Sequence, residues 1–153
     1  MTRFKQHITL DPQFVAKKLQ EFFKEDNIQK DITTISTQEN NKEIQAALVA
    51  KESLVFAGIE IIQQGFLDCM IVDIVSDGTC LKQGDVIAII QGKINSILKK
   101  ERVILNLIQR LSGIASTTYQ LSQITNQYNI ELLDTRKTTP GLRVFEKFAV
   151  TVG

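Results

Sequence analysis

The C-terminal part of the chain alternates between helical and strand-like patterns in an order that few folds share. Apolar residues recur at helical spacing over residues 95–128, and the short apolar segment 130–133 is expected to be a strand. A polar, basic segment then occupies 134–141, and residues 142–152 have the pattern of an amphipathic helix. Helix, strand, charged loop and helix is the order found in an α/β barrel, where the loop after a strand carries the functional residues.

The length of the chain excludes a complete barrel. An eight-stranded α/β barrel needs at least about 200 residues, whereas this chain has 153. We therefore expect only the start of a barrel, with about one strand and two helices, preceded by a domain of another kind.

The N-terminal part is predicted to begin with an amphipathic helix. Asp11 and Pro12 are typical of a helix start, because an Asp side chain can cap the first turn and Pro needs no hydrogen bond there. The helix should end at about Asp26 and bury one apolar stripe. The members of this stripe are Phe14, Val15, Leu19, Phe22 and Phe23.

A small, mostly β module is expected over about residues 30–92. A polar loop or short strand is predicted at 31–34, strands at 44–50, 69–75 and 86–90, a short apolar segment at 54–57, and a short helix at 58–65. Turn signals occur at 77–78 and 83–85, and Gly92 is expected to end the last strand. Farther on, Ser112 and Gly113 mark a place where the long helix could kink or divide.

Charge, cysteine content and motifs exclude several classes of function. The net charge of +1 argues against a general electrostatic attraction to nucleic acid or to an anionic membrane. The two cysteines, Cys69 and Cys80, and the single histidine, His7, are too few for a Cys/His zinc site, and we predict no metal ligands. No GxGxxG or P-loop motif occurs, and no Ser-His-Asp arrangement is expected, because the only histidine is His7 in the loosely patterned N-terminus.

No segment of the chain predicts a membrane or secreted location. The longest apolar stretches fall far short of the roughly 20 residues that span a bilayer. Residues 1–10 have scattered polar and basic side chains, unlike a secretory signal. We therefore expect a soluble, cytoplasmic protein with two reduced thiols.

The strongest candidate for a binding site is the segment Thr135-Arg136-Lys137-Thr138. Two adjacent cations beside hydroxyl groups, ahead of a stiff Pro-Gly turn, suit an anion, because Arg presents a planar fork to a carboxylate and Lys a compact charge. The alternative is a solvated basic loop. Asp134 could orient one of the two cations or serve only as a cap.

A second candidate is the Glu101-Arg102 pair within the apolar part of the long helix. A charge in such a run is costly unless it is paired or serves a ligand. The alternative is an interhelical salt bridge. Glu146 and Lys147, at the start of the last helix, are most simply surface or pairing charges.

Several longer stretches resemble the type II phosphoribosyltransferases, and in particular the quinolinate phosphoribosyltransferase (nicotinate-nucleotide pyrophosphorylase, carboxylating) family. The resemblance is carried by Glu101-Arg102 with Leu105-Asn106, by 109–115, by 134–143 and by 146–150. Weaker matches lie at 25–26, 31–34, 57–58 and 84–85. These matches follow the family order over nearly the whole chain.

The resemblance implies an α/β (α+β) protein of two parts. An N-terminal α/β sandwich domain would cover 1–111, and 112–153 would be the truncated start of an α/β-barrel phosphoribosyltransferase domain. The later barrel strands of the family, with their acidic residues and Gly-rich loops, do not occur in this sequence. We therefore expect a fragment of the enzyme that is inactive alone.

The implied reaction transfers phosphoribosyl from phosphoribosyl pyrophosphate to quinolinate with Mg²⁺, and yields nicotinate mononucleotide, CO₂ and pyrophosphate for NAD biosynthesis. By position in the family motifs, Arg136 and Lys137 resemble quinolinate ligands, with Thr135 beside them. Arg102 resembles a further ligand that reaches into the neighbouring subunit's site of a homodimer. The Mg²⁺ ligands would belong to the barrel strands that this sequence lacks.

Other functions remain open at this point. The chain could belong to a related type II phosphoribosyltransferase that acts on another acidic ring. A carrier-like binding module is suggested by 77–90, although the lysine-bearing hairpin of such modules is missing. A non-catalytic protein that only dimerises is the third alternative.

Overall fold

The first helix and the antiparallel strands form where their local sequence predicts them. The computed structural model describes residues 9–28 and 42–153. Helix α1 spans Pro12–Glu25, and the Asp11 side chain caps it by accepting the Phe14 N–H at 2.7 Å. Val15, Leu19 and Phe23 are buried on its apolar stripe, with Phe14 and Phe22 packed partly against the core. The prediction for this helix is confirmed, while the predicted segment 31–34 lies outside the described residues.

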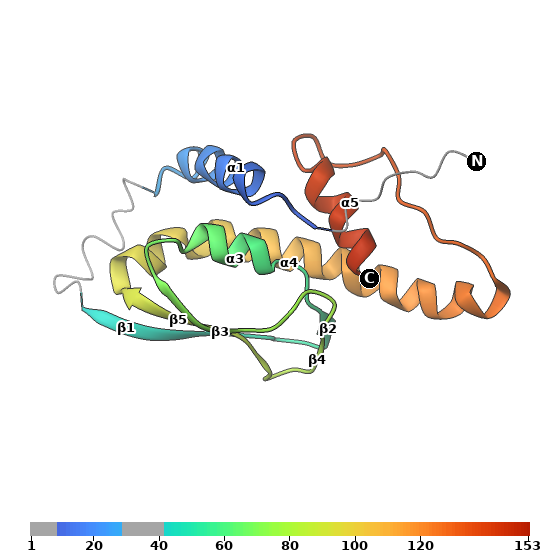
Figure 1. Cartoon of the computed structure of the whole chain (residues 1–153), viewed down its shortest axis with the longest axis horizontal. Coiled ribbons are helices and arrows are strands. Elements are labelled where there is room, and N and C mark those ends of the chain that lie inside the picture. The colour runs from blue at the N-terminus through green and yellow to red at the C-terminus, as the bar shows by residue number, and fades with distance from the viewer. Residues whose placement is uncertain (1–8, 29–41) are drawn as a thin grey trace.

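A three-stranded antiparallel sheet forms the lower layer of Figure 1, in the order β1-β5-β3. Its strands are β1 (Glu43–Val49), β3 (Met70–Ile74) and β5 (Val86–Lys93), and β2 (Leu54–Val55) pairs separately with β4 (Cys80–Leu81). Along β1 exposed and half-buried residues alternate, as expected for a sheet with one solvated face. Gly78 and Gly84 have φ of 84° and 94°, the conformation that the predicted turns require.

Helices cover the other face of this sheet. Helix α3 (Ile59–Gly65) and the long helix α4 (Ile94–Thr125) lie over the strands, and α1 lies over these two helices (Figure 1). The buried side chains form one cluster, in which Phe56, Ile61 and Ile104 are almost fully enclosed. The mixed class of helices and strands is therefore confirmed.

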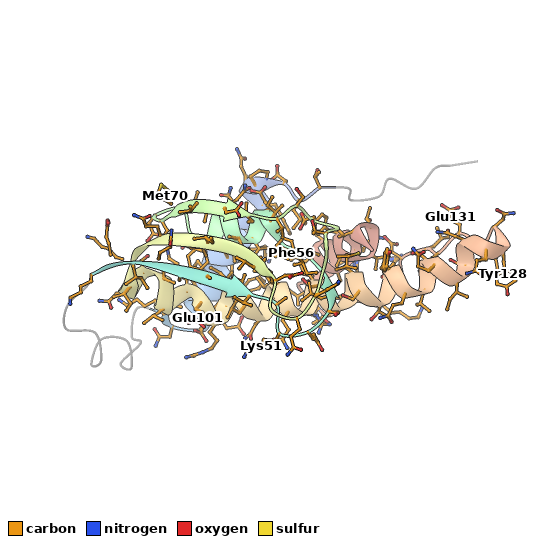
Figure 2. All side chains as sticks on the ribbon, turned by 90° about the horizontal axis from the view of Figure 1, so that it is seen from below. Lys51, Phe56, Met70, Glu101, Tyr128 and Glu131 are labelled. Carbon is orange, nitrogen blue, oxygen red and sulfur yellow. The ribbon has the colours of Figure 1, made fainter. Side chains whose placement is uncertain are left out.

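Helix α4 extends well beyond the sheet and carries the C-terminal part of the chain. It is followed by the 3-10 helix η2 (Asn126–Tyr128), a returning segment and α5 (Arg143–Val152), which packs against α4 (Figure 1). Figure 2 shows Tyr128 and Glu131 at the projecting end, far from Glu101 on the sheet-covered half. Phe145 of α5 lies close to two rings of α1, with centroid distances of 5.5 Å to Phe14 and 6.4 Å to Phe22.

Three local predictions are wrong. Residues 130–133 form no strand, and Ile130 and Leu133 are 57% and 62% exposed, because no strand in the described part of the chain lies beside them to pair with their backbone. Strand β5 does not end at Gly92 but continues to Lys93, since β1 pairs with it along this whole stretch. Helix α4 runs through Ser112 and Gly113 without a break, because Ser112 is buried in its packing face.

The predicted division of the chain into 1–111 and 112–153 falls inside α4. One continuous helix therefore belongs to both predicted parts. Within residues 9–28 and 42–153, no helix combines the length and apolar character that crossing a membrane requires.

Candidate functional site

The segment between η2 and α5 presents the two predicted cations to solvent. Thr135, Arg136 and Lys137 are all exposed, and the Thr135 Oγ1 accepts the Lys137 N–H at 3.1 Å. Among the residues that the structure describes, neither Arg136 nor Lys137 forms an ion pair. Two neighbouring positive charges are thus available to an anion.

Helix α5 holds the backbone on both sides of these cations. Residues 135–138 form the cationic segment. Immediately before it, the Lys147 Nζ donates to Asp134 Oδ1 at 2.6 Å. The Arg143 guanidinium donates to Thr138 Oγ1 at 3.2 Å and to the Arg136 carbonyl at 3.5 Å. Of the roles left open for Asp134, orienting a cation of this segment or serving as a cap, neither describes its side-chain contact, because the carboxylate pairs with a lysine of α5.

A buried carboxylate on α5 joins this segment to α4. Glu146 is only 7% exposed, and its Oε1 accepts from the Arg110 Nε and Nη2 at 2.8 and 2.6 Å. Its Oε2 accepts the Thr139 N–H at 3.1 Å, and Arg110 Nη2 also donates to Thr139 Oγ1 at 2.6 Å. Burial raises the pKa of Glu146, but the hydrogen bonds from Arg110 and Thr139 outweigh it, so the pKa lies below its ordinary value.

Arg110 lies in the stretch 109–115 that carries the family resemblance, but its sequence position predicts no role for it, while Glu146 was expected to be a surface or pairing charge. The pairing is confirmed, but the side chain is buried. A signal was present: Glu146 directly follows Phe145 and stands three residues before Ala149, so helical spacing places it beside the apolar stripe of α5.

Arg102 contacts the end of α1. Its side chain is 69% exposed, and its Nη1 is 3.4 Å from Asp26 Oδ1, just after the end of α1. The premise of a charge on a buried face of the helix is therefore wrong, because Arg102 faces away from the core. No hydrogen bond joins Arg102 to residues 134–142 within the described chain.

A cleft of about 500 Å³ lies between the end of α1, the middle of α4 and the turn before α5. Asp26, Asn106, Arg110 and Pro140 are among its lining residues. Its lining thus includes both the ion-pair partner of Arg102 and the turn that follows the cationic segment. The described residues contain no group of three or more Cys, His, Asp or Glu that could hold a metal ion.

Comparisons with known proteins match nearly the whole chain. Residues 31–112 match the N-terminal domain of quinolinate phosphoribosyl transferase, and residues 114–153 match its C-terminal domain. A probable nicotinate-nucleotide pyrophosphorylase [carboxylating] from Bacillus subtilis is 45% identical over 143 residues, covering 91% of this chain and 49% of that protein. A protein of the same description from Archaeoglobus fulgidus is 37% identical and covers 80% of this chain and 48% of its own.

Solved structures agree with the sequence comparisons. The nicotinate-nucleotide pyrophosphorylase from Francisella tularensis superposes with a TM-score of 0.88 at 32% identity, over 99% of this chain and 55% of that one. The enzyme of that name from Ehrlichia chaffeensis gives 0.82 at 33% identity, over 95% and 53%. The chain thus spans about half the length of these relatives.

Proposed function

The chain belongs to the quinolinate phosphoribosyltransferase family, and from this premise we propose that it provides the quinolinate-binding part of that enzyme. In the proposed reaction, phosphoribosyl passes from phosphoribosyl pyrophosphate to quinolinate, and nicotinate mononucleotide, CO₂ and pyrophosphate are formed. The product is a precursor of NAD. The relatives from Bacillus subtilis and Archaeoglobus fulgidus are described as probable carboxylating nicotinate-nucleotide pyrophosphorylases.

The observation that carries this proposal is the pair of unpartnered cations on a held backbone. Quinolinate has two adjacent carboxylates on a pyridine ring, so its site needs convergent positive charge. Arg136 can bind one carboxylate through two parallel hydrogen bonds, and Lys137 adds a compact charge beside it. The Thr135 hydroxyl, which already accepts the Lys137 N–H, can still donate to the ligand.

These residues would act by orientation and by electrostatics. Cations held in place before the ligand arrives favour one pose of the ring without reorganising during the reaction. A positive charge near the ring also stabilises the negative charge that develops when CO₂ leaves. No covalent intermediate with the protein is part of the proposal.

Arg102 is proposed to serve the site of a second copy in a homodimer. Its guanidinium is largely solvated, and its contact with Asp26 at 3.4 Å is a long, exposed pair that holds it weakly. The side chain is therefore available to a partner subunit.

Mg²⁺ is proposed only as the companion of phosphoribosyl pyrophosphate. The described residues present no acidic cluster for this ion, so none of the steps above depends on it. The charge of +1 supports small-molecule substrates rather than nucleic acid. Cys69 and Cys80 are both unpaired thiols, which supports a reducing compartment such as the cytoplasm.

Calorimetry with quinolinate tests the proposal. We expect Arg136→Ala and Lys137→Ala to weaken binding about tenfold or more, since a hydrogen bond to a charged group contributes about 1.5–3 kcal/mol. Lys51→Ala is the matched control, because Lys51 is an exposed lysine on the connection between β1 and β2 (Figure 2). Unchanged affinity in Arg136→Ala would overturn the role of that residue.

A panel of acidic rings separates the proposed function from that of a related transferase. Quinolinate should bind more tightly than pyridine-3-carboxylate, because only quinolinate engages both cations. A preference for a different acidic ring would favour the alternative enzyme.

A further inference from the structure

Thr139 directly follows the cationic segment and contacts both α4 and α5. Its N–H donates to Glu146 Oε2 at 3.1 Å, and its Oγ1 accepts from Arg110 Nη2 at 2.6 Å. Its carbonyl accepts the Leu142 N–H at 3.0 Å, which closes a turn with Pro140 and Gly141 at its centre. The φ of 82° at Gly141 suits the third position of a type II turn. Every backbone polar group of Thr139 is therefore engaged.

The ion pair that holds Thr139, Arg110 with Glu146, joins helix α4 to helix α5. Arg110 lies on α4 and Glu146 on α5, 36 residues apart, and the guanidinium contacts the carboxylate through both Nε and Nη2. Both carboxylate oxygens are used, because Oε1 accepts from Arg110 and Oε2 from Thr139. A buried carboxylate with both oxygens engaged leaves little freedom to its partners.

We infer that Arg110 and Glu146 are positioning residues for the anion site: by holding Thr139 they hold the backbone that presents Arg136 and Lys137. The inference rests on the proposed function. Neither residue needs to touch quinolinate, because Thr139 is only two residues beyond Lys137 in the chain. The alternative is an ion pair that merely joins α4 to α5.

The two alternatives predict different effects on ligand discrimination. A dicarboxylate gains from two cations at a fixed spacing, while a monocarboxylate uses one of them at a time. Freeing Thr139 would allow Arg136 and Lys137 to change their spacing, so the dicarboxylate would lose the advantage of a preformed site. A purely structural pair would lower stability without changing the ratio of the two affinities.

Glu146→Gln is the principal test variant, and Glu21→Gln is its matched control. Gln at position 146 keeps the side-chain size but has one acceptor oxygen, which cannot serve both Arg110 and the Thr139 N–H. Glu21 undergoes the same chemical change in an ion pair with Lys18 at 2.5 Å, on the exposed surface of α1. We expect the quinolinate Kd to rise about tenfold in Glu146→Gln and the Kd of pyridine-3-carboxylate about twofold or less. The control should match the wild type for both ligands.

Arg110→Lys provides a second variant in case Glu146→Gln folds poorly. A lysine keeps the charge beside Glu146 but cannot also hold Thr139 with a planar fork, so the same fall in the affinity ratio is expected. A fall in melting temperature with an unchanged affinity ratio in both variants would overturn the inference.

Amide hydrogen exchange separates a failure of the inference from a failure of the proposed function. If the wild-type chain does not bind quinolinate, the proposed function is overturned, and exchange then decides the positioning role by itself. Faster exchange of the amides of residues 136–139 in Glu146→Gln than in Glu21→Gln supports it. Equal exchange in the two variants overturns it.

Discussion

Ser112 of α4 accepts a hydrogen bond from the backbone N–H of Ala57 over 3.1 Å, and both residues are buried. One turn later, Ser116 accepts the N–H of Val55 at 2.8 Å and donates to the Ser112 carbonyl at 2.6 Å. Two hydroxyl groups of a helix thus satisfy one backbone donor of β2 and one of the segment that follows it. This contact attaches the long helix to the β module.

Replacing Ser112 by Ala should lower the free energy of unfolding by about 1–3 kcal/mol, because the buried Ala57 N–H would lose its partner. Urea denaturation followed by circular dichroism measures the change. Thr117→Ala is the control, since the exposed Thr117 hydroxyl donates to the Gly113 carbonyl of its own helix. Equal stability of Ser112→Ala and wild type would show that Ser112 does not carry this contact.

Two helical glycines should respond to alanine in opposite directions. A Cβ at Gly65 of α3 would lie 2.5 Å from Ile104 Cδ1, so Gly65→Ala should cost about 1–3 kcal/mol of overpacking. A Cβ at Gly113 of α4 has no heavy atom within 4 Å, so Gly113→Ala should stabilise the protein by about 0.5–1 kcal/mol. Thermal unfolding of both variants checks the two signs.

Ile104→Val tests the reason for the Gly65 effect, because it removes the Cδ1 atom that a new Cβ would meet. The double variant Gly65→Ala/Ile104→Val should lose less stability than the sum of the two single changes. A purely additive result would mean that the steric contact with Ile104 is not the cause.

Asp77 should make the protein less stable as its carboxylate ionises. Burial raises the pKa of Asp77 above its ordinary value of 3.8, although its Oδ1 accepts the N–H groups of Gly58 and Ile59 at 2.5 and 3.1 Å. With a raised folded-state pKa, the stabilising protonation is present at low pH and is lost as pH rises through that pKa. Asp77→Asn keeps an acceptor and has no charge, so its stability relative to wild type should improve from pH 3.5 to pH 7.

The control for this comparison is Asp77→Ala, which lacks any acceptor. It should be less stable than Asp77→Asn at every pH, because two backbone donors at the start of α3 lose their partner. A difference between Asp77→Asn and wild type that does not change with pH would contradict the proposed burial effect. Urea denaturation at a series of pH values provides the data.

Glu146 should have the opposite pH dependence. Because its pKa is lowered in the folded protein, its stabilising contribution is fully present above the ordinary value of 4.5 and is lost as pH falls through the folded-state pKa. The stability difference between wild type and Glu146→Gln should therefore be constant near neutral pH and shrink below about pH 4.5. A constant difference down to pH 3 would show that Arg110 and Thr139 do not favour the ionised form.

Much of the fold could be predicted because its signals are local. The cap at Asp11, the apolar stripe of α1, the glycine turns and the strand β1 each depend on residues close together in the chain. The cationic segment was recognised for the same reason, since Arg136 and Lys137 are adjacent. Nearby residues also decide their solvent exposure, because a short polar loop has little apolar surface to bury.

The remaining features could not be predicted because they depend on partners far away in sequence. Residues 130–133 have an apolar strand pattern, but a strand exists only where a neighbouring strand pairs with its backbone. Arg102 was expected in a buried part of the long helix, but its side chain is exposed. The packing of α1 and α3 decides which faces of α4 are covered, and local sequence does not show that packing.

The sequence by itself determined most of the helices and strands, though not the absence of a strand at 130–133, together with the family and the two adjacent cations. Only the tertiary structure decided how those cations are held. Arg110 and Glu146 are 36 residues apart, and they meet because α5 folds back against α4 and buries Phe145 beside α1. The Glu146 carboxylate is buried and paired only because this packing places it against Arg110 of α4, and such packing joins elements that local sequence patterns do not connect.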